Sequence, residues 1–182
     1  MSTSTRISNW ENIPIGIAEL YMAPYASYES DVTPVLTGGN YLGATVSISL
    51  TANKRYIERK GAIGNVIVLL GNILLESSVR VSAQFMEASA TNLDLTIGGD
   101  GTTPNFLKNI FENPATMRAE MKFRFPNGSY FYIIMPTVQV ITPAVSLNFN
   151  PTDAMQVPLE FSSLACSHTN WSDYPYGRPY YA

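Results

Sequence analysis

The sequence predicts a mainly β fold: an antiparallel β-sandwich or barrel with one short flanking α-helix, a long hairpin loop and terminal arms. Most segments between turns alternate apolar and polar residues with a period of two, which is typical of strands with one buried face. The alternation of strands and long helices that marks a parallel βαβ fold is not seen. Asn127-Gly128 also separates two alternating runs, and this is the strongest short sequence signal for a β-hairpin.

The stretch from Val79 to Gly99 is the centre of this prediction. It begins as a strand, in which one face is apolar: Val79, Val81, Ala83 and Phe85. After Glu87 the period changes to that of a helix. Ser89 is a favoured N-cap residue, and Gly98-Gly99 is a typical C-terminal stop. The residues expected on the packing stripe of this short helix are Ala90, Leu93 and Ile97.

The remaining elements follow from alternation and from turn residues. The expected strands are 17–25, 43–51, 66–70, 73–75, 117–125, 130–135, 138–141, 145–150 and 155–164, with a helix at 105–112 and a turn at Gly71-Asn72. Residues 26–40 form a loop of above-average length, and long loops in compact domains are usually functional or disordered. Pro158 has no N–H to donate, so the last strand is expected to lie at an edge or to carry a bulge there.

Much of the positive charge is concentrated between two of the expected strands. The cluster is Lys54, Arg55, Tyr56, Glu58, Arg59 and Lys60. We expect a β-hairpin whose extended tip carries this cluster. It is either a solvated loop that protects a sheet edge from aggregation or a loop that reaches a neighbouring subunit.

The composition favours a subunit of an assembly. Of the 182 residues, 46% are hydrophobic and only 14% are charged, against about 25% in an ordinary soluble domain. The alternative is a monomer whose surface is covered by Ser, Thr, Asn and Tyr. The net charge is −3 and no basic run exceeds two residues, which argues against a protein that grips nucleic acid by its phosphates.

Signals for a cellular compartment are few. A single cysteine excludes an internal disulfide and suits a reducing cytoplasm. The first sixteen residues lack the apolar region of a signal peptide, and the apolar runs are too short to span a bilayer, so no membrane insertion is expected.

Catalytic, cofactor and metal sites are not expected. Cys166 and His168 supply at most two soft ligands, fewer than a zinc site needs, and neighbours two apart on an extended chain rarely touch. The glycines at 98–101 precede no Lys-Ser/Thr helix, so they are not a phosphate loop. Asp153 and Glu160 are isolated carboxylates, which gives no acid–base pair. The chain is therefore not expected to be an enzyme.

The expected organisation is one domain with two arms. Residues 1–16 form an N-terminal arm anchored by Trp10, residues 17–166 form the β domain, and residues 167–182 form a C-terminal arm. That last segment is either a disordered tail or an arm whose rings, including Trp171, Tyr174 and Tyr176, dock on a neighbour.

Several of these segments resemble the tail tube proteins of long-tailed bacteriophages. The relevant residues are the strand ending in Phe85-Met-Glu, the Ser/Thr-rich turn with Asn92-Leu93, and the Gly98-Gly99 stop. The hairpin from Phe123 to Phe131 and the strand 155–164 complete the same order of elements, so that the resemblance covers residues 17–164.

This resemblance implies a β-sandwich that assembles into homohexameric rings, which stack into a tube in the virion tail after assembly in the host cytoplasm. Other tail proteins at the tube ends, and a tape-measure protein in the lumen, are the further partners it suggests. DNA passes through the lumen without specific binding, and no cofactor is implied. Two alternatives remain: a capsid-decorating or carbohydrate-binding β-sandwich module, and, with least support, an enzyme.

Overall fold

The computed structural model of the chain describes residues 18–63, 66–85, 89–101, 113–142 and 156–182. Within them lie seven strands and one α-helix. The strands are β1 (Glu19–Pro24), β2 (Tyr41–Ile63), β3 (Val66–Phe85), β4 (Thr116–Arg124), β5 (Tyr130–Val140), β6 (Val157–Ser163) and β7 (Arg178–Tyr181). The helix is α1 (Ala90–Thr96), and short 3-10 turns are η2 (Tyr25–Ser27), η3 (Gly38–Asn40) and η4 (Thr169–Trp171).

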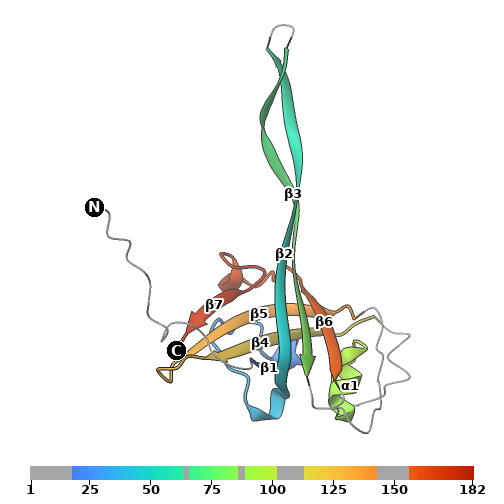
Figure 1. Cartoon of the computed structure of the whole chain (residues 1–182), viewed down its shortest axis with the longest axis vertical. Helices are drawn as coiled ribbons and strands as arrows, with labels where there is room; N and C mark the ends of the chain where they lie inside the picture. Colours follow the sequence, from blue (N-terminus) through green and yellow to red (C-terminus); the bar gives the residue numbers. More distant parts are fainter. Residues whose placement is uncertain (1–17, 64–65, 86–88, 102–112, 143–155) are drawn as a thin grey trace.

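The strands form an antiparallel barrel from which a long arm projects (Figure 1). The order is β4-β1-β2-β3-β6-β5-β7, and an additional β4–β5 pairing closes the sheet. β7 pairs with the first half of β5, beyond the short stretch where β5 pairs with β6. The predicted mainly β, antiparallel fold with one short helix is therefore confirmed.

The barrel interior is filled by the apolar faces of the alternating strands. β6 shows the pattern most clearly, because Val157, Leu159, Phe161 and Ser163 are buried while the residues between them are half-buried. Pro158 opposes Gln84 of β3, whereas the pairing of β6 with β5 covers only Phe161–Ser163. Among the described residues, Pro158 thus has a strand on one side only, in agreement with the expected edge position.

The predicted helix forms with the predicted ends. The Ser89 side chain accepts a hydrogen bond from the Asn92 N–H at 3.1 Å. At the other end, Gly98 has a φ of 92°, and the Gly98 and Gly99 N–H groups donate to Leu95 and Asp94 in a Schellman arrangement. Leu93 packs against the core but is only half-buried, whereas Leu95 is 2% exposed. The packing stripe is therefore centred on Leu95 and not on Leu93.

The hairpin of β4 and β5 is confirmed, with Gly128 at a φ of 87° in its turn. The expectation of two separate strands at 130–135 and 138–141 is wrong, because β5 runs through Pro136 without interruption. The register shifts between Met117 and Ala119, so Pro136 and Thr137 oppose a single residue of β4. A bulge of this kind tolerates a residue that cannot donate a ladder hydrogen bond.

The turn expected at Gly71-Asn72 is also wrong. Gly71 pairs with Arg59 and Asn72 with Glu58, so both lie in the middle of β3. The expected strands at 66–70 and 73–75 and the strand that begins at Val79 are one continuous strand, which pairs with β2 from Val66 to Phe85. The register shifts at Gly71, and a glycine inside a strand often marks such an irregularity.

Residues 167–182 fold onto the barrel of their own chain. η4 places Trp171 against Ile134 and Cys166, and β7 pairs with β5 from Phe131 to Ile134. The helix expected at 105–112, the strand at 145–150 and the N-terminal arm with Trp10 lie outside the described residues.

Candidate functional site

The arm is formed by the outer parts of β2 and β3. β1 pairs with β2 only up to Ala44, and β6 pairs with β3 only from Val79 onward. Within the described chain, the outer halves of the two strands pair only with each other. Figure 1 shows them rising from the barrel as a narrow two-stranded ribbon. A hairpin of this kind is marginally stable in water by itself, so the arm depends on contacts beyond its own hydrogen bonds.

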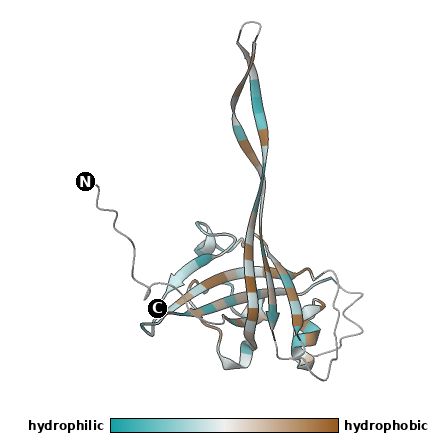
Figure 2. Cartoon of the chain, in the orientation of Figure 1, coloured by the Kyte–Doolittle hydropathy of each residue, from teal (hydrophilic) through white to brown (hydrophobic). Residues whose placement is uncertain are grey.

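Large apolar side chains are exposed along the arm. Ile67, near its outer end, is 74% exposed, and Leu69 is 57% exposed. The other exposed members of this set are Tyr56, Ile57, Ile73 and Leu74. Figure 2 shows brown, hydrophobic bands among teal ones along the ribbon. Exposed apolar surface that is gathered on one projection is typical of a protein–protein contact.

The charged cluster predicted at the tip lies partway along the arm instead. Residues 54–60 pair with residues 69–77 of β3, and the arm continues beyond them to Ile63 and Val66. Lys60 forms an exposed ion pair with Glu58 at 2.9 Å. Lys54, Arg55 and Arg59 have no ion-pair partner among the residues that the structure describes, which leaves three cations available to an acidic partner.

The aromatic residues expected at a subunit contact lie in different environments. Trp171 is fully buried, and its Nε1–H donates to the Glu29 carbonyl at 3.1 Å. It is part of the core, so it has no surface for a contact with another subunit. Tyr174 is exposed and lies under the Arg178 guanidinium, 5.4 Å from the ring centroid. Tyr176 is half-buried, and its carbonyl accepts a hydrogen bond from Ser163. A contact of Tyr174 or Tyr176 with a neighbour stays a prediction.

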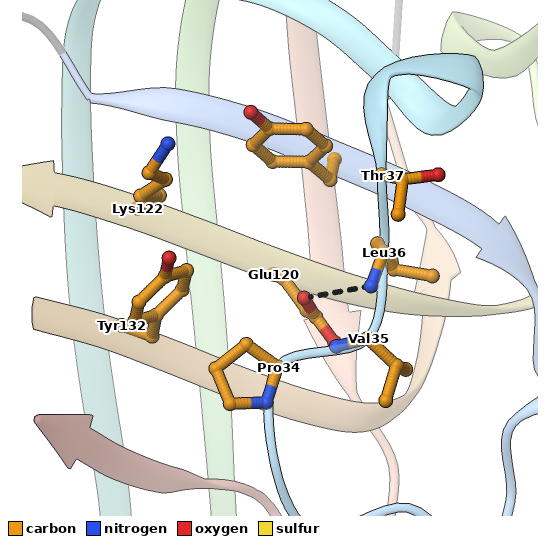
Figure 3. A pocket seen from close by; sticks show the side chains of 8 residues that line it. Pro34, Val35, Leu36, Thr37, Glu120, Lys122 and Tyr132 are labelled. Carbon is orange, nitrogen blue, oxygen red and sulfur yellow. Dashed lines mark hydrogen bonds between the residues drawn. The ribbon is translucent and has the colours of Figure 1, made fainter. Parts of the chain in front are cut away.

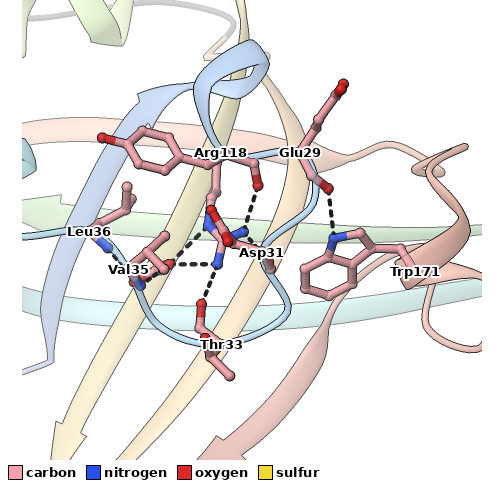
Figure 4. A network of polar contacts seen from close by, with 9 residues as sticks. Glu29, Asp31, Thr33, Val35, Leu36, Arg118 and Trp171 are labelled. Atoms are coloured by element: carbon pink, nitrogen blue, oxygen red, sulfur yellow. Dashed lines mark hydrogen bonds and ion pairs between the residues drawn. The ribbon is translucent and has the colours of Figure 1, made fainter.

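A buried ion pair on β4 was not found from the sequence. The Arg118 Nη2 lies 2.7 Å from the Glu120 Oε1, and both side chains are almost fully buried. Arg118 also donates to the carbonyls of Tyr28, Asp31 and Thr33 in the loop between β1 and β2. Figure 4 shows the guanidinium enclosed by this loop. Opposite charges two apart on a strand share a face, and this was the one available sequence signal.

Glu120 holds the same loop from the other side. Its Oε1 accepts from the Val35 N–H at 3.1 Å, and its Oε2 accepts from the Leu36 N–H at 3.2 Å. The Trp171 ring lies 5.8 Å from the Arg118 guanidinium carbon, so the C-terminal segment covers the pair. Both oxygens of the Glu120 carboxylate, the group that could act as a base here, accept hydrogen bonds from the chain itself. The arrangement therefore fixes the long loop and offers no reactive site.

A cavity of about 320 Å³ lies beside this network. Its lining combines Tyr21, Lys122 and Tyr132 with Glu120 and loop residues 34–37 (Figure 3). Lys122 forms an ion pair with Glu19 at 3.0 Å. Burial alone would lower the pKa of Lys122, but the hydrogen bond to Glu19 and the charges of Glu19 and nearby tyrosines together outweigh it, so the pKa is raised. The cavity therefore contains paired charges and phenols but no activated nucleophile.

The Cys166–His168 pair is not brought together. The Cys166 thiol lies 3.5 Å from the Tyr25 hydroxyl, and this hydrogen bond, together with burial, raises the pKa of Tyr25 to about 12. The His168 Nδ1 instead accepts from the Asn170 N–H. In the described part of the chain, no three His, Cys, Asp or Glu side chains are grouped to hold a metal ion. Nor is any described helix long and apolar enough to cross a membrane.

Comparison with known proteins places the fold. No family model matches the chain, and no curated protein matches it. A chain of the PVC sheath–tube complex of an extracellular contractile injection system, in its extended state, has a TM-score of 0.50 at 12% identity over 98% of this chain and 99% of that one. A chain of the virion of a native gene transfer agent particle has a TM-score of 0.41 at 10% identity, over 80% of this chain and 90% of that one. Hcp1 from Salmonella typhimurium has a TM-score of 0.37 at 12% identity, over 80% of this chain and 81% of that one. Of these three, only the first reaches a TM-score of 0.5, and at its low identity it indicates a shared fold.

Proposed function

We propose that the chain is the structural subunit of a phage-type tail tube. Six copies form a ring, and rings stack into a hollow tube whose lumen conducts DNA. The fold shared with a chain of a sheath–tube complex along nearly its whole length supports this assignment. The order of elements that resembles tail tube proteins supports it independently.

The arm is the observation that carries the proposal. A two-stranded ribbon with exposed apolar residues on it requires a partner surface, because burial of such residues is the main favourable term in association. In a stack of identical rings, each contact is heterologous, so the arm of one copy meets a different surface of another copy. Lys54, Arg55 and Arg59 on the same arm have no ion-pair partner within the described residues, which suits a partner surface that is acidic.

The charge of the chain suits a conduit. With a net charge of −3 and no basic run longer than two residues, the subunit offers little attraction for a polyanion. DNA then passes through the lumen without adhering to the wall. We expect purified assemblies to retain no DNA at physiological salt.

Negative-stain microscopy of concentrated protein tests the assignment. We expect rings or tubes from the parent chain, and we expect Ile67→Asn/Leu69→Asn to remain folded but unassembled, because both residues are exposed. Tyr181→Ser is the matched control, since it removes an exposed aromatic residue from the body of the barrel. A compact monomer at every concentration would contradict the proposal, and a trimer that binds a glycan would favour the carbohydrate-binding alternative.

A further inference from the structure

The barrel core is open at one end, beside the base of the arm. An apolar cavity of about 230 Å³ lies there. Its walls are Leu50 and Val79 at the arm base, Phe131, Ile133 and Met135 on β5, and residues 176–179 before and within β7. Leu50 is 46% exposed, although it faces this apolar surface. We call this opening the mouth groove.

β1 begins at Glu19, next to β2, the strand that carries Leu50 of the groove wall. β1 lies between β2 and β4, and the Thr45 N–H and hydroxyl both donate to the Ala18 carbonyl, at 2.9 and 2.8 Å. Glu19 pairs with Lys122, so Ala18 is level with the next residue of β4, Phe123. Phe123 in turn pairs with Phe131 of the groove wall.

β2 continues past Thr45 to Leu50, on the opposite wall. Beyond Ala18, the position between β2 and β4 therefore carries no strand in the described part of the chain. Ala18 thus lies between β2, which carries Leu50 of one groove wall, and the β4 residue that pairs with Phe131 of the other. The seventeen residues that precede Ala18 start from this point in every copy.

We propose that residues 10–17 bind in the mouth groove of their own chain, with Trp10 as the anchor. The segment Trp-Glu-Asn-Ile-Pro-Ile-Gly-Ile carries Trp10, Ile13, Ile15 and Ile17 and a single charge, that of Glu11. Its eight residues span up to about 26–29 Å when extended, so Trp10 reaches any part of the groove from Ala18. An indole buries about 150–250 Å² of surface, which suits a groove lined by Leu50, Val79 and Phe131.

Covalent connection favours this occupant over a second copy. A tethered segment acts at an effective concentration in the millimolar range for a short linker, whereas a second chain must be recruited from solution. The exposed apolar residues of the arm lie toward its outer end, away from the groove at its base. They could enter the groove only from another copy. This inference does not depend on the proposed tube function.

Tryptophan fluorescence tests the docking. The chain has two tryptophans, and Trp171 is fully buried, so the difference between the parent and Trp10→Phe isolates the emission of Trp10. We expect the emission of Trp10 to be blue-shifted and poorly quenched by acrylamide. The measurement is made at protein concentrations where the chain is monomeric. Leu50→Arg should raise this quenching several-fold, whereas the control Leu69→Arg, on the arm, should not change it. A Trp10 equally accessible in the parent and in Leu50→Arg would overturn the proposal.

A disulfide identifies which chain supplies the segment. The variant Trp10→Cys/Leu50→Cys is oxidised with glutathione disulfide, and Trp10→Cys alone serves as the control for pairing with the buried Cys166. We expect a monomer of increased electrophoretic mobility in the double variant only. Covalent dimers would assign the occupant to a second copy, and an absence of disulfide would show that Trp10 does not reach Leu50. Either result contradicts the proposal.

Discussion

Arg118 and Glu120, two residues apart on β4, form a buried ion pair with 2.7 Å between the Nη2 and Oε1 atoms. Both side chains also bind the backbone of the β1–β2 loop, at carbonyls from Tyr28 to Thr33 and at the N–H groups of Val35 and Leu36. The pair therefore gives a long loop one defined conformation. A buried pair is weak evidence for stability by itself, but the loss of one partner leaves an uncompensated charge.

Removal of Arg118 should be strongly destabilising. Arg118→Met leaves Glu120 charged and buried, and we expect the free energy of unfolding in urea to fall by about 3–5 kcal/mol. Arg118→Met/Glu120→Leu should lose less than the sum of the two single variants, because the two residues act as a unit. The control Arg124→Met changes an exposed residue of the same strand and should cost little. Additive losses would show that the pair is not coupled.

The helix should depend on Leu95 more than on Leu93. Leu95→Ala removes a fully buried side chain and should lower the free energy of unfolding by about 2–5 kcal/mol. Leu93→Ala removes a half-buried one from the edge of the core and should cost clearly less. Thermal and urea unfolding of the two variants measure the difference. Equal costs would mean that the helix packs on the stripe expected from the sequence.

Charge reversal on the arm should block assembly without affecting the fold. This prediction rests on the proposed tube function. Arg55 and Arg59 are exposed, so Arg55→Glu/Arg59→Glu should keep the circular dichroism of the parent but fail to form tubes. Added salt should weaken assembly of the parent, because exposed charges are screened. If the double variant polymerises like the parent, the cations do not contact another subunit.

Gly177 should tolerate no side chain. Its φ is 129°, and a Cβ there would lie 2.5 Å from the Ile134 carbonyl oxygen. Gly177→Ala should therefore displace the segment that leads into β7 and cost at least about 1–3 kcal/mol of the free energy of unfolding. Gly39→Ala is the matched control, because nothing lies within 4 Å of its Cβ position. Similar stability of the two variants would be evidence against this close approach.

Acid should remove the contribution of Glu19 to the free energy of unfolding. Burial raises the pKa of Glu19, but hydrogen bonds from Lys122 and Tyr21 and the positive charges of Lys122 and Arg124 together outweigh it and hold the pKa below its usual value of 4.5. The folded pKa is the lower one, so the stabilisation is complete above about pH 4.5 and is lost as the pH falls through the folded pKa.

The Glu19–Lys122 ion pair is partly exposed, so we expect it to contribute less than about 1 kcal/mol to the free energy of unfolding. Glu19→Gln should reduce the difference between the unfolding free energies at pH 7 and pH 3, and Lys122→Met should act in the same direction. An unchanged pH dependence in both variants would contradict this role of the pair.

The sequence by itself determined the features that depend on neighbours along the chain. The strand from Val79 to Phe85, the cap at Ser89, the stop at Gly98 and the turn at Gly128 were all predicted, and all are present. Each is governed by backbone geometry or by a hydrogen bond that spans only a few residues, so composition and spacing are sufficient to find it.

Only the tertiary structure decided which segments meet. Gly71-Asn72 reads locally as a turn, but pairing with Glu58 and Arg59 on β2 keeps both residues in a strand and extends the arm beyond the charged cluster. Nothing near Arg118 and Glu120 in the sequence indicates that the β1–β2 loop covers them. Trp171 reads as a residue of a disordered tail or of an arm that docks on a neighbour, yet it is buried against Ile134 of its own chain. In all three cases the deciding contact joins residues distant in sequence, and local propensity carries no information about such a partner.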